Sequence, residues 1–440
     1  MMSAQSMDNG RQSPPLKGFW SQSDELPETA DVVVIGAGIV GVSLALFLAK
    51  SGCTTVLLEK GRIGGEQSGR NLGWCRASGR SDAETPLGVL SMSLWDDFAT
   101  TLESDTGFRR CGRLFLCRSA EEIAEQDRRA EITRRYGIYT ARLVSSELKQ
   151  FLPNASRSWP AAYYVPEDGK AEPELTVPVI AAGAQTAGAK VYPWCAVRKL
   201  EIAGGRVTGV ITEKGRISCS RAVVTAGAWS SLFLRSAGLR LPIIQIAASV
   251  LRTAPVEGAS GPCIGTADFG FRSHLDGSYS VSPFGGAVSL TPDTLRFAWK
   301  FLPALRQRGG AVSFRFDRGA REAWLRAIPG SRRRQLWYEQ EREIDRDPSD
   351  GRLSQAFQSF LEARPDCAGA SVIHRWAGVI DASPDSVPTI DAAPEITGLW
   401  FATGFSGHGF GLGPGAGRLL ADMVTDAKPS VDPAPFRFRR

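Results

Sequence analysis

The sequence predicts two domains, an α/β domain built on a parallel sheet and an α+β domain with a mainly antiparallel sheet. The first is indicated by the apolar, β-branched run at residues 32–35, which is typical of a strand buried on both faces. Residues 220–237 repeat the same order of buried strand, glycine and helix. The second is indicated by residues 241–283, where strand patterns alternate with polar turns such as Asp276-Gly277, a hairpin signal.

Three glycines follow the first strand with the spacing G-x-G-x-x-G, and an apolar helical pattern covers residues 39–48. Gly36 permits a tight turn, Gly38 lets backbone approach a pyrophosphate, and Gly41 lets helix and strand pack closely. The helix N-terminus then presents free N–H groups and a positive dipole end to phosphates. This arrangement predicts a dinucleotide site; the alternative is a glycine-rich turn that holds no ligand.

The second predicted strand, residues 55–58, ends in Glu59. An acidic residue at this distance from the glycines accepts a hydrogen bond from a ribose hydroxyl. The same carboxylate disfavours a 2′-phosphate, so the position argues against NADP.

Length and composition narrow the possible classes. The 440 residues suffice for two or three domains, and no run reaches the roughly 18 apolar residues of a membrane span. The first 30 residues contain no apolar secretory signal, and we expect a flexible arm over residues 1–28. We expect a cytoplasmic protein, with peripheral contact on the inner face of the membrane as an open alternative.

The cysteines, histidines and charges exclude several kinds of site. The eight cysteines form no C-x-x-C pair, which excludes a zinc ribbon and fits a reducing compartment. The three histidines lie far apart, so we predict no metal. The net charge of +6 is mild, and no basic groove with interleaved aromatic residues indicates nucleic acid. Basic clusters at residues 332–334 and in the tail, residues 429–440, indicate either solvated surface or attraction to an anionic membrane.

Residues 60–80 are rich in glycine and serine without periodicity, which is typical of a functional loop. Helices are predicted at residues 82–103 (capped by Asp82), 120–136, 172–187, 291–305, 317–327, 350–363 and 414–424, with a short one within 143–152. Strands are predicted at residues 113–117, 190–192, 196–202, 207–212, 220–225, 311–316, 371–378 and 399–403. Residues 404–413 are predicted to be a glycine-dense turn.

The predicted elements divide the chain into discontinuous domains. We expect a cofactor domain from residues 29–90, 165–236 and 372–428. We expect a substrate domain from residues 91–164 and 237–371. Within the latter, residues 291–350 form a candidate module facing a membrane or an electron acceptor.

Several motifs resemble one known family. They are DVVVIGAGIVG, LLEKGRIGGEQSGRNLG, RAVVTAGAWS and ATGFSGHGFGLGPGAGRLLADMV. On these residues the chain resembles the D-amino-acid oxidase/dehydrogenase-like superfamily of FAD amine oxidoreductases, and within it the bacterial L-amino acid deaminases and D-amino-acid dehydrogenases. The resemblance implies a two-domain amine oxidoreductase fold, with a Rossmann-like FAD-binding domain and a substrate domain above the flavin. It also implies non-covalent FAD, because the C-terminal turn lacks the cysteine that sarcosine oxidases attach to flavin.

The resemblance and the glycine motifs together predict the residues that contact FAD. The turn at residues 404–413 is expected to touch the flavin ring, and the following helix N-terminus to stabilise negative charge on the reduced ring. His408 in that turn either hydrogen-bonds the flavin or only packs. The predicted cofactor-binding residues are Gly36, Gly38, Ile39, Val40, Gly41, Glu59, Lys60, Gln67, Ser68, Gly69, Arg70, Asn71, Gly73, Val197, Ala226, Gly227, Trp229, Gly378, Gly404, His408, Gly409, Phe410 and Gly411.

Five residues are predicted to bind substrate. Arg272 matches the place where the similar deaminases put an arginine that grips the substrate carboxylate, and a guanidinium fits a carboxylate with two hydrogen bonds. Gln245 also matches a deaminase pocket position. Trp74 and Arg76 follow the flavin loop, and Phe405 stands where the deaminases have an aromatic wall. Arg76 as a second anion-binding group would suit a dicarboxylate or opine-like substrate; a surface arginine on a strand is the alternative for Arg272.

The resemblance implies an FAD-dependent amino acid oxidase or dehydrogenase. Hydride passes from the α C–H of a neutral amine to flavin N5, and the resulting imine hydrolyses to a 2-oxo acid and ammonia. The electron acceptor is O2 or a respiratory-chain quinone or cytochrome. Two alternatives stay open: a dehydrogenase of secondary amines (opines, N-methyl or cyclic imino acids), and a flavoprotein without turnover.

Overall fold

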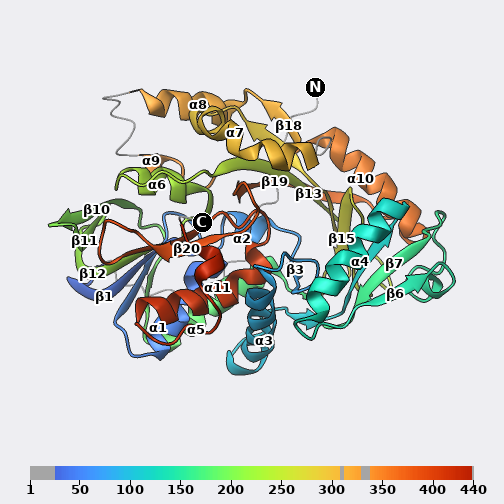
Figure 1. Ribbon diagram of the computed structural model, residues 1–440, viewed down its shortest axis with the longest axis horizontal. Helices are drawn as coiled ribbons and strands as arrows, with labels where there is room; N and C mark the ends of the chain where they lie inside the picture. The colour runs from blue at the N-terminus through green and yellow to red at the C-terminus, as the bar shows by residue number, and fades with distance from the viewer. Residues whose placement is uncertain (1–24, 308–311, 329–336, 439–440) are drawn as a thin grey trace, which may run out of the picture.

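The computed structural model describes residues 25–307, 312–328 and 337–438. Most of the predicted N-terminal arm and the arginines at 332–334, 439 and 440 lie outside the described residues. The described part of the chain forms one eight-stranded sheet, one ten-stranded sheet and a small three-stranded sheet. Figure 1 shows the first sheet at one end of the molecule and the second at the other end.

The eight-stranded sheet has the order β10-β11-β12-β1-β2-β9, with β21 beside β12 and β20 beside β21. β1 pairs in parallel with both β12 and β2, as the glycine motif predicts. Its strands are β1 (Thr29–Ile35), β2 (Thr55–Leu58), β9 (Lys190–Tyr192), β10 (Val197–Ala203), β11 (Arg206–Thr212), β12 (Arg216–Val224), β20 (Thr389–Ala392) and β21 (Leu399–Thr403).

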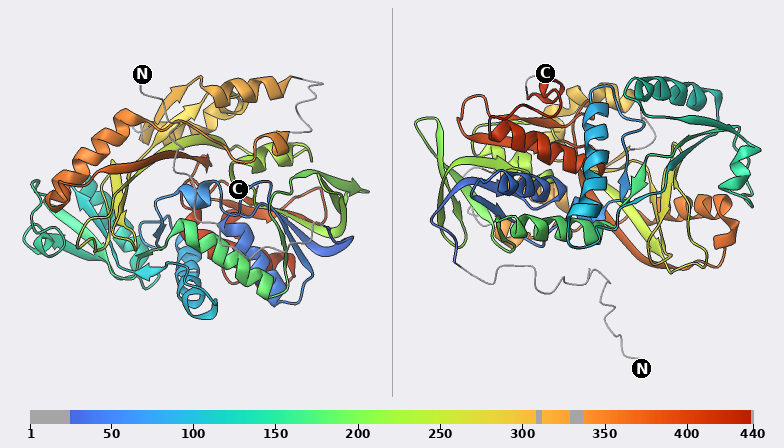
Figure 2. Two further views of the ribbon diagram at one scale, coloured as in Figure 1. Left: turned by 180° about the vertical axis from the view of Figure 1, so that it is seen from behind. Right: turned by 90° about the horizontal axis from the view of Figure 1, so that it is seen from below.

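Helices cover one face of this sheet. Figure 2 shows α1 (Ile39–Lys50), α11 (Gly409–Val424) and α5 (Pro173–Thr186) side by side, with α3 (Thr85–Thr101) across their ends. Alternate residues of β1 enter different cores, Val32 and Val34 beneath these helices and Val33 on the opposite face. Burial on both faces explains why this strand is an unbroken apolar run. On the other face, α6 (Ser230–Arg235) and α9 (Trp337–Gln340) contribute Phe233 and Tyr338 to the core that contains Val33. The short helix α2 (Gln67–Arg70) contacts α5 and β19.

The ten-stranded sheet has the order β18-β17-β13-β16-β15-β14-β5-β7-β6, with β19 paired to β13. It is antiparallel except at β14–β5 and β17–β18, which confirms a mainly antiparallel sheet. Its strands are β5 (Arg113–Cys117), β6 (Ala141–Val144), β7 (Ala161–Val165), β13 (Ile244–Thr253), β14 (Cys263–Gly265), β15 (Phe269–Ser273), β16 (Tyr279–Pro283), β17 (Gly286–Ser289), β18 (Val312–Arg315) and β19 (Val372–Ala382). Its helices are α4 (Ala120–Arg134), α7 (Pro292–Gln307), α8 (Arg318–Ala327) and α10 (Asp350–Ala363).

The strands of the three-stranded sheet lie along the chain between strands of the two larger sheets. It consists of β3 (Trp74–Cys75), β8 (Gly169–Lys170) and β4 (Arg109–Arg110), with β8 in the centre. The predicted domain boundaries are not tested by these pairings and stay a prediction.

Two local predictions were wrong. Asp82 does not cap α3; the helix begins at Thr85, and Asp82 lies at the surface beside Arg135. Residues 409–413 are not a turn but the first turns of α11. Glycines of α11 let this helix pack closely against α1. A Cβ at Gly413 would lie 2.6 Å from Ile39 Cγ1, and one at Gly417 would lie 2.7 Å from Leu44 N.

Candidate active site

A cavity of about 1870 Å³ lies between the two large sheets. Its wall includes Gly36 and Glu59 from the parallel sheet, and Ile246 and Ala248 from β13 of the antiparallel sheet. Ordinary ligand pockets measure about 300–1,000 Å³. The cavity therefore has room for a dinucleotide and a small substrate together.

The glycine motif leaves no room for side chains. Gly36 has φ +104°, and a Cβ there would lie 2.7 Å from Thr225 O. A Cβ at Gly38 would lie 3.0 Å from Ser68 Oγ, and one at Gly41 would lie 1.9 Å from Gly36 O. Gly36 and Gly38 form the cavity wall, so backbone reaches the ligand as the motif requires.

Glu59 lies at the end of β2 with its carboxylate buried against the glycine turn. Oε2 accepts from Ala37 N at 2.9 Å, and Oε1 accepts from Gly61 N at 2.8 Å. Burial raises the pKa of Glu59, although Lys60 and both backbone N–H groups oppose the rise. A carboxylate has about four acceptor sites, so these two bonds leave capacity for ribose hydroxyls.

The loop after β2 folds onto the start of α1. Ser68 Oγ accepts from Ile39 N at 2.9 Å, and Asn71 Oδ1 accepts from Gly73 N at 2.6 Å. Lys60 donates to Glu66 at 3.0 Å and to the carbonyl of Glu341 at 2.9 Å. The loop is therefore ordered and held along the cavity, whereas its composition had left open whether it is ordered or disordered.

The start of α11 forms another part of the wall through His408, Gly409 and Phe410. His408 Nδ1 lies 2.8 Å from Glu84 Oε1. Burial and Arg80 lower the pKa of His408 to about 4, although Glu84 acts in the opposite direction. Burial opposes ionisation of Glu84, but His408, Arg80 and Ser81 outweigh it and lower its pKa to about 2. The pair is a neutral imidazole beside a carboxylate at neutral pH.

Most of the predicted site residues line this cavity. Among the predicted substrate residues these are Trp74, Arg76 and Phe405. Among the predicted cofactor residues they are Gly36, Gly38, Ile39, Val40, Glu59, Lys60, Gln67, Ser68, Arg70, Asn71, Gly73, Val197, Ala226, Gly227, Trp229, Gly378, His408, Gly409 and Phe410.

Four predicted cofactor glycines do not line the cavity. Gly41 and Gly69 face backbone, because a Cβ would lie 1.9 Å from Gly36 O and 2.4 Å from Gly64 O, respectively. Gly404 has φ +78° and packs on Ile243. The carbonyl of Gly411 accepts from Ser91 Oγ at 2.7 Å, which ties α11 to α3. These glycines permit close packing behind the wall.

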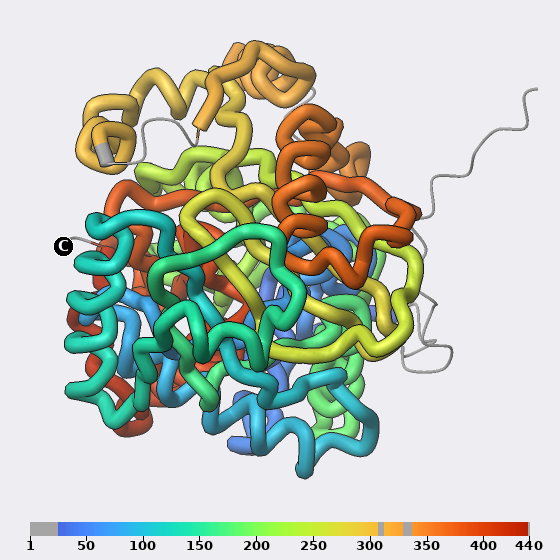
Figure 3. The backbone as a smooth tube through the Cα atoms, turned by 90° about the vertical axis from the view of Figure 1, so that its right-hand side faces the viewer, coloured from blue at the N-terminus to red at the C-terminus, as the bar shows by residue number. Residues whose placement is uncertain are grey.

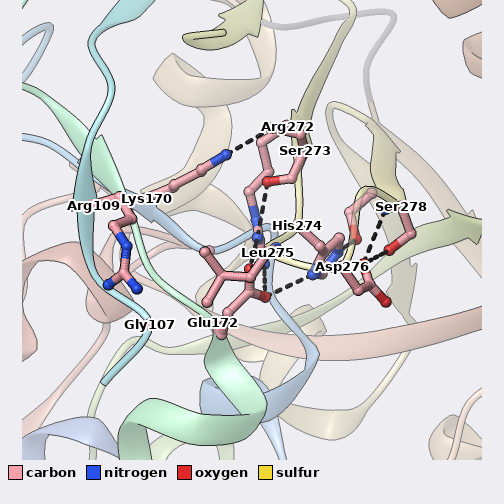
Figure 4. A network of polar contacts seen from close by, with 12 residues as sticks. Gly107, Arg109, Lys170, Glu172, Arg272, Ser273, His274, Leu275, Asp276 and Ser278 are labelled. Carbon is pink, nitrogen blue, oxygen red and sulfur yellow. Dashed lines mark hydrogen bonds and ion pairs between the residues drawn. The ribbon is translucent and has the colours of Figure 1, made fainter. Parts of the chain in front are cut away.

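Arg272 is buried away from the cavity. It is 1% exposed and does not line the cavity. Its Nη1 and Nη2 form an ion pair with Glu172 at 2.9 and 3.1 Å, and its Nε donates to the carbonyl of Leu72 at 2.7 Å. Glu172 therefore occupies the fork that a substrate carboxylate would use. Figure 4 shows the contacts of Arg272 and His274 converging on Glu172.

The same network fixes the charge states of its members. His274 Nδ1 lies 2.6 Å from Glu172 Oε2, and its Nε2 lies 2.7 Å from Ser280 Oγ. Burial and Arg272 lower the pKa of His274 to about 4 against the influence of Glu172. Burial disfavours the charged form of Glu172, but His274 and Arg272 outweigh it and hold its pKa far below the usual value.

Gln245 also lies away from the cavity. Its side chain lies outside the cavity wall and its Nε2 donates to the carbonyl of Ala228 at 3.1 Å. It therefore connects β13 to the segment Gly227–Trp229 instead of facing a ligand.

Sequence reasoning missed Arg80, Glu84 and Arg113, which line the cavity and lie far apart in the sequence from His408. The signal for Arg80 was its place in the glycine- and serine-rich loop that ends at residue 80. No signal pointed to Arg113, because it begins an ordinary apolar strand.

The family model for FAD dependent oxidoreductases (DAO) matches residues 31–423. The chain belongs to this family. The solved structure of the L-amino acid deaminase from Proteus myxofaciens in complex with anthranilate superposes with a TM-score of 0.89 at 30% identity, over 95% of each chain. The L-proline dehydrogenase from P. horikoshii superposes with a TM-score of 0.76 at 25% identity, over 94% of this chain and 99% of the other.

Curated proteins related in sequence also match over most of the chain. Glycine oxidase from Pseudomonas aeruginosa is 25% identical over 92% of this chain and 97% of its own length. The chain spans about half, 46%, of the length of 4-methylaminobutanoate oxidase (formaldehyde-forming) from Paenarthrobacter nicotinovorans, also at 25% identity. The predicted fold, the FAD cofactor and the class of oxidoreductase acting on C–N bonds are thereby confirmed.

Proposed function

We propose that the chain oxidises the Cα–N bond of a free amino acid, yielding a 2-oxo acid and ammonia. One observation carries this proposal: a single cavity joins the dinucleotide motif to a wall of β13 residues and arginines, so cofactor and a carboxylated amine can meet within it. The full-length likeness to an L-amino acid deaminase supports the primary amine.

The residues of the wall divide between cofactor and substrate. Gly36, Gly38, Ser68 and Glu59 would hold the FAD, which accepts a hydride when bound. The N-terminus of α11 places its positive dipole end at the cavity, where negative charge develops on reduction. Phe405 and Trp74 supply apolar surface, which excludes water from a neutral amine.

Anaerobic titration of the purified flavoprotein tests the proposal. In a panel of amino acids of both hands, the substrate should bleach the flavin absorbance near 450 nm on the order of once per active site, and ammonia should appear on reoxidation. A flavin that no amino acid reduces would leave the protein as a flavoprotein without this activity.

A secondary amine is the second candidate, because 4-methylaminobutanoate oxidase is among the relatives. The two candidates differ in their products. A primary amine releases ammonia, whereas an N-methyl amino acid releases methylamine or formaldehyde. Product analysis with alanine and N-methylalanine therefore decides between them.

We further propose that electrons leave to a membrane acceptor, with α7, β18 and α8 facing the bilayer. Leu295, Trp299 and Leu302 lie at helical spacing on α7 and are 57%, 67% and 48% exposed. Phe316 and Trp324 next to them are 66% and 42% exposed. Figure 3 shows this segment as a layer raised above the rest of the chain. Exposed apolar side chains of this size are typical of a docking surface.

Vesicle sedimentation tests the membrane proposal. The full-length holoprotein should sediment with vesicles of phosphatidylglycerol and phosphatidylethanolamine, and Trp299→Ser with Phe316→Ser should abolish this while flavin content stays unchanged. Reduction of a soluble quinone faster than of O2 would support the acceptor. Among the described residues no helix combines the length and apolarity needed to cross a bilayer.

A further inference from the structure

Three arginines gather at one end of the cavity, next to the start of α11. Arg76 follows β3, Arg113 begins β5, and both residues line the cavity together with Arg80. A Cβ built on Gly79 would lie 3.1 Å from Arg76 Nη1 and 3.4 Å from Arg113 Nη1. The guanidiniums of Arg76 and Arg113 thus approach the same point of the backbone.

These arginines have donors without partners. Within the described residues, Arg80 Nε and Nη1 and Arg113 Nε are buried and make no hydrogen bond, and none of the three arginines is within ion-pair distance of a carboxylate. Trp74 Nε1, on the same wall, is also buried and unpaired. Arg76 Nη1 donates to the carbonyl of Ser78 at 2.5 Å. The unpaired groups at this end of the cavity are all donors, and they suit an acceptor with negative charge.

The local charges match one carboxylate. Burial and repulsion from Arg80 and Arg113 lower the pKa of Arg76 far below its usual value, and burial is the main reason that the pKa of Arg113 falls to about 10. The neighbouring carboxylates are Asp168, which accepts from Ala77 N at 3.0 Å, and Glu84. Arg129 also lowers the pKa of Arg76 and Arg113, but it is paired with Glu125 at 2.7 Å. The three arginines of the cluster therefore face two carboxylates beside a neutral His408, which leaves one positive charge unmatched.

We propose that Arg76, Arg80 and Arg113 bind the carboxylate of the amino acid substrate. The assignment rests on the function proposed above and gives it a specific anchor. Arg272 is unavailable for this role because Glu172 fills its fork. A planar guanidinium binds a carboxylate through two parallel hydrogen bonds and thereby fixes the Cα hydrogen against the cofactor.

Binding of an unreactive ligand tests the anchor without turnover. Anthranilate carries a carboxylate and an amino group but has no Cα hydrogen to lose, and aniline is the same ring without the carboxylate. Titrations of both into the FAD-containing protein are followed by the change in visible flavin absorbance. Arg76→Gln and Arg113→Gln should each weaken anthranilate binding about 10- to 100-fold and leave aniline binding unchanged. Arg76→Lys should recover part of the loss, because it restores the charge without the fork.

Two further variants complete the design. Arg134→Gln removes a 72% exposed arginine on α4 and should not change anthranilate binding. Arg272→Gln should lower stability but not the ratio of the anthranilate and aniline dissociation constants. Flavin content per protein shows which variants have folded. The anchor is overturned if Arg272→Gln selectively loses anthranilate while Arg76→Gln and Arg113→Gln retain it.

Substrate turnover separates this inference from the proposed function. If no amino acid reduces the flavin, the function fails, yet the anthranilate titration still reports on the anchor. If amino acids do reduce it, Arg76→Gln should lower kcat/KM for alanine and aspartate alike. A loss confined to aspartate would mean that the cluster binds a side-chain carboxylate and would overturn the assignment.

Discussion

The cofactor side and the substrate side of the cavity are built in different ways. The cofactor side consists largely of backbone from one short stretch, in which Gly36, Gly38 and Glu59 lie within 24 residues of one another. The substrate side and the network behind it depend on charged side chains that meet across long separations, 324 residues for His408 and Glu84 in the wall and 100 for Arg272 and Glu172 behind it. Local sequence therefore specifies the first, whereas only the folded chain specifies the second.

The largest effect is expected from the cofactor side. Gly41→Ala would place a Cβ 1.9 Å from Gly36 O, and backbone cannot move away as a side chain would. We expect little folded protein and no bound flavin, as measured by absorbance and circular dichroism. Gly351→Ala is the matched control, because nothing lies within 4 Å of its added Cβ. A flavin-replete Gly41→Ala protein would contradict the backbone description of this side.

The buried ion pair on the substrate side comes next. Glu172→Ala leaves the charge of Arg272 buried without its partner, and we expect the free energy of unfolding to fall by about 3–5 kcal/mol. Urea unfolding measures this. Glu131→Ala, which breaks an exposed pair with Arg134, should cost at most about 1 kcal/mol. Equal losses in the two variants would show that the network around Glu172 contributes no special stability.

His274 should make stability depend on pH. Its pKa is lowered to about 4 in the fold, chiefly by burial, from an ordinary value of 6.5. The unfolded chain therefore binds the extra proton between pH 4 and 6.5, and the folded state loses up to about 3 kcal/mol as pH falls through this window. In His274→Gln the free energy of unfolding should change less between pH 6.5 and 4. An unchanged pH profile would exclude His274 as its source.

The smallest effect is expected at Asp82. Its carboxylate is 55% exposed and pairs with Arg135 at 3.1 Å, so Asp82→Ala should change the free energy of unfolding by less than about 1 kcal/mol. Ser119→Ala should cost about 1 kcal/mol, because Ser119 caps α4 by accepting from the N–H of Glu122. Thermal unfolding compares the two. A larger loss of unfolding free energy in Asp82→Ala than in Ser119→Ala would indicate that Asp82 does cap α3.

The sequence predicted the fold class and a dinucleotide site, because strand burial and glycine spacing are local properties, and the family resemblance implied FAD. Most of the residues predicted for the site do line the cavity. The sequence showed no sign of the partner of Arg272, since nothing near that residue shows that Glu172 will pair with it. It also misread the glycines of α11, because glycine is typical of turns and its use for helix contact depends on the partner, here Ile39 and Leu44. Arg113 was missed because the local sequence at the start of β5 does not show which distant residues will surround it in the fold.

Residues 337–344 constrain how the protein can be shortened. Lys60 donates to the carbonyls of Glu341 and Arg342, and Arg62 pairs with Glu343 at 2.6 Å. Residues 341–343 thus hold the start of the loop that follows β2 in place. A trimmed version for crystallisation or immobilisation should be cut upstream of Trp337, since excision through residue 350 would strip the loop of its counter-charges.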